Sequence, residues 1–484
     1  MNRAVKYLPR LQDIFFIALF FAILLLGNRM INLDGDLPRH LTFGRLILSE
    51  RQIPPTEPLI YPYENRPYTS HEWLSQVIYQ AVYSVTGLPG LVFLSAVLLA
   101  STFFILYQYL VQRVSLRLPI LFIIGWGAVA TSLNWAIRPH LFSMLLLAVW
   151  LIWADRLRRG EDISIWRFPI LMILWSNFHG IFIAGVLVLF AFAAGWVVDF
   201  LFAKEGNPAT GKRLWLALIM SIAGSVLNPG GADSWFSILG FVNNQYLMSR
   251  MLEANSPNFQ LPELRIILIL LVFSIFLLAV KREKFSSGQG FLLAGFTAMS
   301  LMAFRNIQLY GVVAPFVLAE AFHGLKDAPI LGRLEGTLAN IEGKIRGFYY
   351  PVITSIVLGI FILTSPISKA LYQFEPDTFP VKAVTWLKSN PQDGNMFNDL
   401  NWGGYLELNL YPQKTFVDSV ADVTGEVTRD YETILTTSVG WEDLVTFYNI
   451  QWVLITPDSS LAQALQEKGW NILYEDETAI ILRK

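Results

Sequence analysis

The chain has 484 residues, of which 54% are hydrophobic and only 15% are charged. A soluble domain carries about 25% charged residues, so this composition predicts a membrane protein. The formal net charge of -1 gives no basic surface for nucleic acid, and the absence of cysteine excludes disulfides, thiolate nucleophiles and cysteine zinc sites.

Apolar segments long enough to cross a bilayer define an expected membrane domain, residues 1–366. A crossing helix needs about 20 apolar residues to span about 30 Å of hydrocarbon. The first segment, LQDIFFIALFFAILLLGNRMI, is longer than the apolar core of a signal peptide and has no small-residue cleavage site after it, which indicates a retained span. The eleven predicted spans lie near residues 11–31, 88–111, 118–135, 139–154, 163–178, 180–202, 213–228, 263–280, 288–304, 307–324 and 347–365.

Clusters of Lys and Arg set the expected orientation, because basic residues collect in short cytoplasmic loops. With eleven spans, all of these clusters fall on one face, so the N-terminus is expected in the cytoplasm and the C-terminus outside it. The clusters are Arg3, Lys6 and Arg10; Arg113 and Arg117; Arg156, Arg158 and Arg159; Lys204, Lys212 and Arg213; Lys281, Arg282 and Lys284; and Lys326, Arg333, Lys344 and Arg346.

Two long segments are expected on the opposite, outer face. In the first outer loop, residues 31–87, Asp36 is placed to cap a helix with Pro38 in its first turn, and a second helix begins near Leu74. The pattern of both helices predicts that they lie along the membrane surface. The second outer loop, residues 229–262, is long enough to cover a site.

The composition changes after the last span, and residues 375–484 are more charged with shorter apolar segments. Alternating helices and strands predict a small α/β domain outside the membrane. The expected helices are VKAVTWLK, VTRDYETIL, WEDLVTFY and LAQALQEKG, and the expected strands are NMFN, KTFVD, QWVLIT, ILYE and AIILR. The sequence WGGY at 402–405 is interpreted as a structural turn with aromatic packing.

Asp34 and Asp36 are the candidate catalytic residues. They lie one glycine apart, directly after the first span. A carboxylate there can act as general base for an acceptor hydroxyl or bind a hard cation. The alternative is a turn followed by a helix cap, without chemistry.

Histidines and an acid gather in the same outer regions. His40 follows the aspartates, and His71 and Glu72 end the first outer loop. A divalent cation held by Asp34, Asp36, His71 and Glu72 is one expectation; capping and anchoring of a surface helix is the other. Asn177 and His179 lie at a tight helix junction, either as part of a pocket or as a turn with satisfied polar groups.

Two outer arginines are candidates for an anionic ligand. Arg138 and Arg305 adjoin outer span ends, where basic residues are disfavoured, and each has a polar neighbour, His140 or Asn306. Their guanidinium groups suit a phosphate, and lipid headgroups are the competing ligand.

Several motifs in order carry a family resemblance. They are LDGDLPRHLTFGRLIL, PYTSHEWL, RPHLFS, WSNFHGIFIAG, RNIQLY and WGGYLELN. Together with the first-loop acids, the predicted spans and the outer domain, they resemble the GT-C membrane glycosyltransferases, and more closely a group of poorly characterised bacterial multi-pass membrane proteins related to them. The likeness covers nearly the whole chain.

The resemblance implies transfer of a sugar from a polyprenyl-phosphate donor to a glycan, lipid or protein acceptor at the outer face of the bacterial cytoplasmic membrane, by an inverting displacement. The family's first-loop aspartate corresponds to Asp34 or Asp36, and the arginine that meets the donor phosphate to Arg138 or Arg305. The ending of the first loop in His71-Glu72 departs from the family pattern and leaves a non-sugar reaction or a lost activity open.

Two other classes of function compete with the transferase. A non-catalytic membrane protein would bind a lipid-linked glycan or scaffold an envelope assembly. An ion-coupled transporter usually needs an ionisable group at mid-depth of a span, and the predicted spans carry their few acids near cytoplasmic ends.

Overall fold

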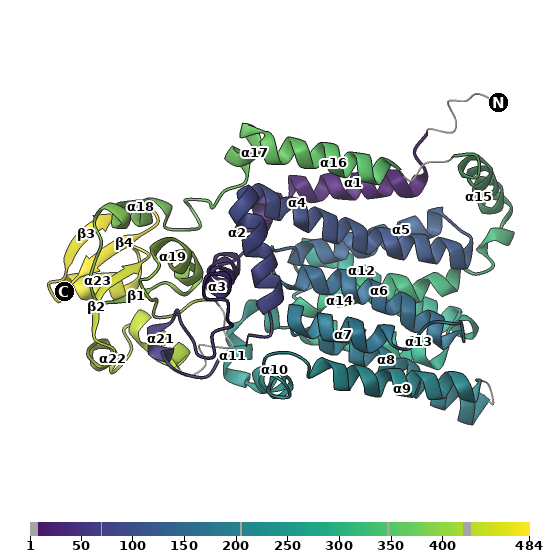
Figure 1. Ribbon diagram of the computed structural model, residues 1–484, viewed down its shortest axis with the longest axis horizontal. Coiled ribbons are helices and arrows are strands. Elements are labelled where there is room, and N and C mark those ends of the chain that lie inside the picture. The colour runs from purple at the N-terminus through teal and green to yellow at the C-terminus, as the bar shows by residue number, and fades with distance from the viewer. Residues whose placement is uncertain (1–7, 69, 204–205, 346–348, 420–426) are drawn as a thin grey trace.

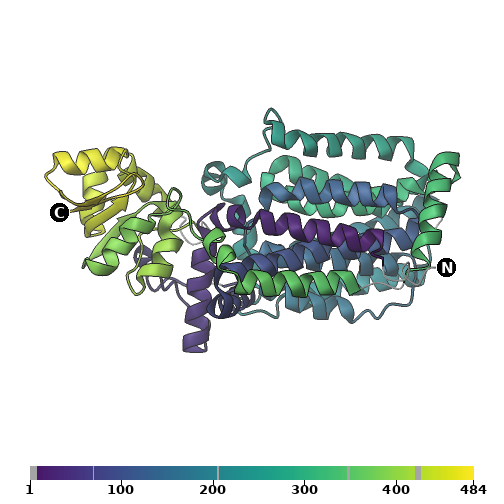
Figure 2. The ribbon, with the colours of Figure 1, turned by 90° about the horizontal axis from the view of Figure 1, so that it is seen from above.

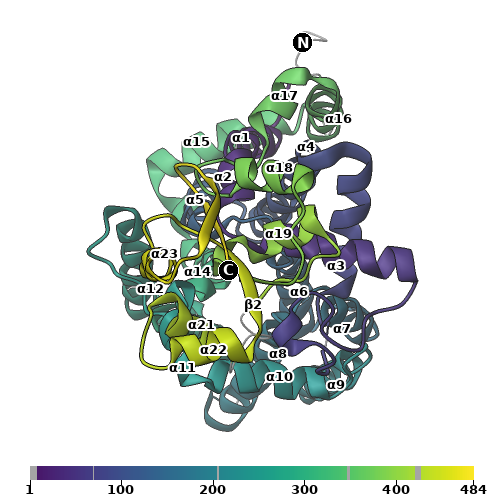
Figure 3. The ribbon, with the colours of Figure 1, turned by 90° about the vertical axis from the view of Figure 1, so that its left-hand side faces the viewer.

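The computed structural model describes residues 8–68, 70–203, 206–345, 349–419 and 427–484. A bundle of long helices forms one part, and a smaller α/β domain covers one end of it (Figures 1 and 2). Figure 3 looks onto that end and shows the C-terminal domain in front of the bundle.

Every predicted span coincides with a helix of the bundle. The helices are α1 (Leu11–Leu25) with α2 (Gly27–Asn32), α4 (Trp73–Val114), α5 (Leu118–Thr131), α6 (His140–Arg158), α7 (Arg167–Phe178), α8 (Phe182–Val198), α9 (Pro208–Ser225), α12 (Arg265–Val280), α13 (Ser287–Met302), α14 (Ile307–Leu318) and α16 (Tyr349–Thr364). Among the described residues, five helical segments are long and apolar enough to cross a bilayer by length and composition. The number of crossings, eleven, stays a prediction.

The surface around the sides of the helix bundle is apolar. On α12, Ile267 and Leu270 are buried, whereas Val272 and Ile275 are 58% and 61% exposed. In water such a surface would be unfavourable, but lipid chains cover it at no cost. The exposed apolar side chains therefore agree with a membrane protein.

Helix α4 joins a predicted surface helix to a predicted span. Gly87 has φ of 66° inside it, and Pro89 follows two residues later. Glycine adopts this left-handed conformation without steric cost, and proline lacks an N–H to continue the helix, so the axis kinks here. The kink lets the first part of α4 run beside α3 at the end of the bundle.

The first outer loop contains α3 (Asp36–Glu50), which lies across the end of the bundle (Figures 1 and 2). The second outer loop contains α10 (Asp233–Asn243) and α11 (Gln245–Arg250). At the opposite end lies α15 (Pro329–Glu342), whose Glu342 contacts Arg117 of a basic cluster. A short α17 (Pro366–Leu371) leads into the C-terminal domain.

The C-terminal domain has a four-stranded sheet of order β1-β2-β4-β3. Strand β1 is parallel to β2, and β4 is antiparallel to both β2 and β3. The strands are Asn395–Asn398, Ile450–Ile455, Asn471–Glu475 and Ile480–Arg483, and the helices are α18 (Val381–Ser389), α19 (Gly403–Leu410), α21 (Val427–Leu435), α22 (Trp441–Phe447) and α23 (Ser460–Glu467). All predicted helices of this domain and four of its five predicted strands are confirmed.

Two local predictions for this domain are wrong. The segment KTFVD forms no strand, because its backbone pairs with the first outer loop at a single position. The N–H of Thr415 donates to the backbone oxygen of Leu59 at 3.0 Å, and the backbone oxygen of Thr415 accepts from the N–H of Tyr61 at 3.0 Å. The sequence WGGY begins helix α19 instead of forming a turn. A side chain at Gly404 would lie 2.6 Å from the backbone oxygen of Gly35, so the glycine allows α19 to pack closely against α3.

One buried arginine connects the first outer loop to the C-terminal domain. Arg39 of α3 is 1% exposed and pairs with Glu57 at 2.8 Å, with Glu407 at 3.5 Å and with Asp418. Three carboxylates thus depend on one cation. Burial raises the pKa of Glu407 to about 7, which lowers the negative charge that Arg39 must balance.

We expect Arg39→Met to detach the C-terminal domain from the bundle. Removing the cation leaves buried carboxylates unpaired, which costs about 3–5 kcal/mol. A lower melting temperature and faster proteolysis between residues 366 and 380 would show this. Arg51→Met, at the exposed end of the same helix, is the control; equal effects of the two substitutions would contradict the role of Arg39.

Candidate active site

The structure brings Asp34 and Asp36 together with Arg138. The two acids connect α2 to α3, and Arg138 precedes α6. The Nε of Arg138 lies 2.9 Å from Oδ2 of Asp34 and 3.0 Å from Oδ2 of Asp36. All three side chains are less than a quarter exposed. Acids predicted as catalytic and an arginine predicted to bind phosphate therefore form one cluster.

Backbone contacts fix this cluster from both sides. The N–H of Asp36 donates to Oδ1 of Asp34 at 3.0 Å, so the predicted turn before the helix is also present. The hydroxyl of Tyr79 donates to the backbone oxygen of Arg138 at 2.7 Å. A side chain at Gly35 would lie 2.3 Å from the backbone oxygen of Asn401, so the C-terminal domain reaches the turn only because residue 35 is glycine.

The environment of the two acids favours proton transfer. Burial raises the pKa of Asp34 and of Asp36 above the ordinary value, and the charge of Arg138 opposes this rise. Burial by itself lowers the pKa of Arg138, but the neighbouring carboxylates raise it above its ordinary value, so the guanidinium stays charged. A carboxylate with a raised pKa is a stronger base, and it is held beside a permanent cation.

A third acid, Glu253, also reaches Arg138. It lies in the short helix Leu252–Ala254 of the second outer loop, and its Oε2 is 3.2 Å from Nη1 of Arg138. Arg305 contacts the same loop at another point: its Nη2 is 4.0 Å from the sulfur of Met248. No motif or spacing marked Glu253 in the sequence, because its role depends on how a long loop folds back.

Glu72 lies beside two of the four outer histidines, His40 and His179. Oε1 of Glu72 lies 3.3 Å from Nε2 of His179, and its Oε2 lies 3.8 Å from Nδ1 of His40. Burial lowers the pKa of His40 to about 3, so this imidazole is neutral at physiological pH. Nδ1 of His71 and Nε2 of His140 are buried and make no hydrogen bond within the protein.

Among the described residues, no three His, Asp or Glu side chains are arranged to hold a metal ion. Arg138 already contacts one oxygen of Asp34 and one of Asp36, so a cation there would compete with the guanidinium. The divalent cation stays a prediction.

The side-chain amides of Asn177 and Asn306 form hydrogen bonds to other parts of the chain than the acid cluster. Asn177 accepts from the indole of Trp73 at 2.7 Å and donates to the backbone oxygens of Ile173 and Leu227 at 2.7 and 3.0 Å. Asn306 donates to the backbone oxygen of Met299 at 2.9 Å. Both amides therefore bond to backbone oxygens near helix ends, and a role of Asn177 and Asn306 in substrate binding stays a prediction.

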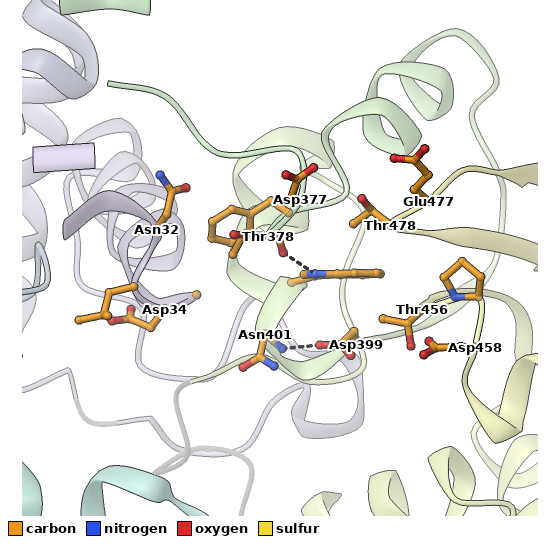
Figure 4. Close-up of a pocket in the computed structure, with 15 residues that line it drawn as sticks. Asn32, Asp34, Asp377, Thr378, Asp399, Asn401, Thr456, Asp458, Glu477 and Thr478 are labelled. Atoms are coloured by element: carbon orange, nitrogen blue, oxygen red, sulfur yellow. Dashed lines mark hydrogen bonds between the residues drawn. The ribbon is translucent and has the colours of Figure 1, made fainter. Parts of the chain in front are cut away.

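A cavity of about 860 Å³ lies between the first outer loop and the C-terminal domain, beside their direct contacts. Asn32 and Asp34 form one side, and Asp458, Glu477 and Thr478 face them across it (Figure 4). Its lining is Asn32, Leu33, Asp34, Gly35, Asp377, Thr378, Phe379, Asp399, Asn401, Trp402, Thr456, Pro457, Asp458, Glu477 and Thr478. The lining combines apolar and acidic side chains, and Asp34 belongs both to the cavity and to the Arg138 cluster.

A second, apolar hollow of about 520 Å³ lies between α5 and α12. It is lined by Leu121, Phe122, Gly125, Trp126, Val129 and Ile266. The chain continues from the end of α5 through Ser132–Asn134 to Arg138. The hollow therefore adjoins the helix after which Arg138 follows in the chain.

No family model and no curated protein matches the sequence. The structure is similar to the archaeal oligosaccharyltransferase AglB from Archaeoglobus fulgidus, solved with an inhibitory peptide and a dolichol-phosphate, with a TM-score of 0.60 and 12% identity over 91% of this chain and 69% of that one. It is also similar to ArnT from Cupriavidus metallidurans, with a TM-score of 0.54 and 14% identity over 97% of both chains. The chain therefore shares the fold of these two membrane proteins, and the resemblance predicted from its motifs is confirmed at the level of the fold.

Proposed function

We propose that this protein transfers a sugar from a polyprenyl-phosphate donor to an acceptor at the outer face of the bacterial cytoplasmic membrane. The observation that carries the proposal is the contact of Arg138 with Asp34 and Asp36 at the wall of the cavity. An anion-binding group and a general base are thereby side by side. The structural neighbours support a lipid phosphate, because ArnT was also solved with undecaprenyl phosphate and AglB with a dolichol-phosphate.

The donor would use the apolar hollow, the two arginines and the cavity. Its prenyl chain fits the apolar hollow between α5 and α12. Its phosphate would meet Arg138 and Arg305, because a guanidinium donates two parallel hydrogen bonds to phosphate oxygens. The sugar would then project toward the cavity, where Asp34 lies.

Asp34 is the proposed base because it lines the cavity, whereas Asp36 does not. In the reaction, an acceptor hydroxyl oxygen bonds to the anomeric carbon while Asp34 takes its proton. The bond from that carbon to the phosphate oxygen breaks, and the lipid phosphate leaves with the electron pair, stabilised by the arginines. Attack from the side opposite the phosphate inverts the anomeric centre.

The cavity also limits the acceptor. Five of its lining residues, Asp34, Asp377, Asp399, Asp458 and Glu477, are acidic, and none of the described lining residues is Lys or Arg. Carboxylates accept hydrogen bonds from hydroxyl groups and repel anions. The proposed acceptor therefore presents hydroxyl groups and is neutral or positively charged.

Asp34→Asn should abolish transfer while retaining lipid-phosphate binding. General-base catalysis contributes about 10²–10⁴-fold, so we expect a loss of at least about 100-fold. Only the deprotonated carboxylate is a base, and its pKa is raised, so the parent activity should increase with pH through that pKa and the residual activity of the variant should not. The measurement is glycan product formed from a polyprenyl-phosphate sugar across a pH series.

Asp393→Asn is the control for this experiment, since it removes an exposed carboxylate of the C-terminal domain that does not line the cavity. Unchanged product formation in both Asp34→Asn and Asp36→Asn would contradict catalysis and favour the non-catalytic binding or scaffold function.

Arg138→Lys and Arg305→Lys should each weaken lipid-phosphate binding. Lysine keeps the charge but cannot make the paired hydrogen bonds of a guanidinium, so we expect about a tenfold loss of affinity. Arg265→Lys, an exposed arginine at the outer end of α12, is the control. If all three variants bind undecaprenyl phosphate like the parent, these arginines contact lipid headgroups only.

A reporter that is active only in the cytoplasm should be silent when fused after Lys484. This follows from the positions of the basic clusters. One of them includes Arg117, which contacts Glu342 of α15, and α15 lies at the end of the bundle remote from the C-terminal domain (Figure 1). The same reporter fused in the segment between Lys281 and Lys284 should be active. The reverse pattern would overturn the proposed sidedness of the site.

A further inference from the structure

The second outer loop places a carboxylate at the arginines proposed to bind phosphate. Glu253 contacts Arg138 at 3.2 Å. Two residues later, the backbone oxygen of Asn255 accepts a hydrogen bond from the N–H of Phe304 at 2.9 Å, which joins the loop to the residue preceding Arg305. Burial lowers the pKa of Arg305 below its ordinary value. The negative charge of Glu253 partly offsets this, as expected for a nearby anion. Glu253 therefore carries its negative charge close to both guanidinium groups.

This part of the loop is held mainly by surface contacts. Tyr246 donates to Glu432 of the C-terminal domain at 2.7 Å, and its ring is contacted by the guanidinium groups of Arg250 and Arg429 at 3.7 and 4.5 Å. Leu247 is buried, but Leu252, next to Glu253, is 89% exposed. Arg250 also forms an exposed ion pair with Glu432, and such pairs are worth only about 0–1 kcal/mol each. The segment around Glu253 is therefore not fixed by a large buried core.

We propose that Glu253 occupies the phosphate position at Arg138 when no lipid phosphate is bound, and that it is displaced by the donor and returns to displace the lipid-phosphate product. The inference rests on the proposed function. A carboxylate and a phosphate offer the same guanidinium the same kind of paired oxygen acceptors, so they compete for it. After transfer, the leaving lipid phosphate carries more negative charge than the donor diester, and a competing carboxylate favours its release.

The test compares the binding of undecaprenyl phosphate and of undecaprenol, which lacks the phosphate, to detergent-solubilised protein by native mass spectrometry. We expect Glu253→Gln to bind undecaprenyl phosphate about tenfold more tightly than the parent, with undecaprenol binding unchanged. Added undecaprenyl phosphate should also inhibit transfer more strongly in this variant. Glu253→Ala should behave in the same way, and it replaces the Gln variant if that variant does not fold.

Glu263→Gln is the matched control, since Glu263 is an exposed acid near the end of the same loop; it should bind both lipids like the parent. If the parent prefers undecaprenyl phosphate over undecaprenol but neither Glu253 variant binds it more tightly, Glu253 does not compete with phosphate and the inference is wrong. If the parent itself shows no preference for the phosphate, the phosphate site of the proposed function fails, and the inference fails with it.

Discussion

The buried guanidinium of Arg39 is the interaction on which the arrangement of the outer region depends. Charged groups away from water are stable only with matched partners, and Arg39 has Glu57 from its own loop and Glu407 and Asp418 from the C-terminal domain. The raised pKa of Glu407, about 7, keeps part of the surplus negative charge neutral. Because these side chains are all buried, their contact holds the C-terminal domain against the first outer loop.

That position defines the site. Arg39 is one helical turn beyond Asp36, so the contact that fixes α3 also fixes the turn carrying both acids. Gly35 and Gly404 allow the C-terminal domain to approach within contact distance. The domain then forms the far wall of a cavity whose near wall includes Asp34. The cavity exists because two segments nearly 400 residues apart in sequence meet at one end of a helix bundle.

Local patterns predicted much of this. Apolar segments of bilayer length identified the helices of the bundle, since that signal resides in adjacent residues. The outer acids, arginine and histidines were predicted as candidates because sidedness follows from counting spans. Counting the spans put Asp34, Asp36 and Arg138 on the same expected face, and the structure places them in contact.

Long-range contacts were not predictable. Nothing in the local sequence distinguishes Arg39 or Glu253, because the partners that matter lie far away in sequence. The segment KTFVD has the composition of a strand, yet its backbone pairs with the first outer loop at a single position. WGGY contains turn residues, yet its glycines permit helix packing. In each case a tertiary contact outweighed the local preference.

The most direct test of the central claim is a structure of the protein in lipid nanodiscs with undecaprenyl phosphate. The proposed function predicts phosphate density within hydrogen-bond distance of both Arg138 and Arg305, a prenyl chain along the hollow between α5 and α12, and Asp34 facing the cavity. Phosphate density elsewhere, with Arg138 still in contact with Glu253, would contradict it.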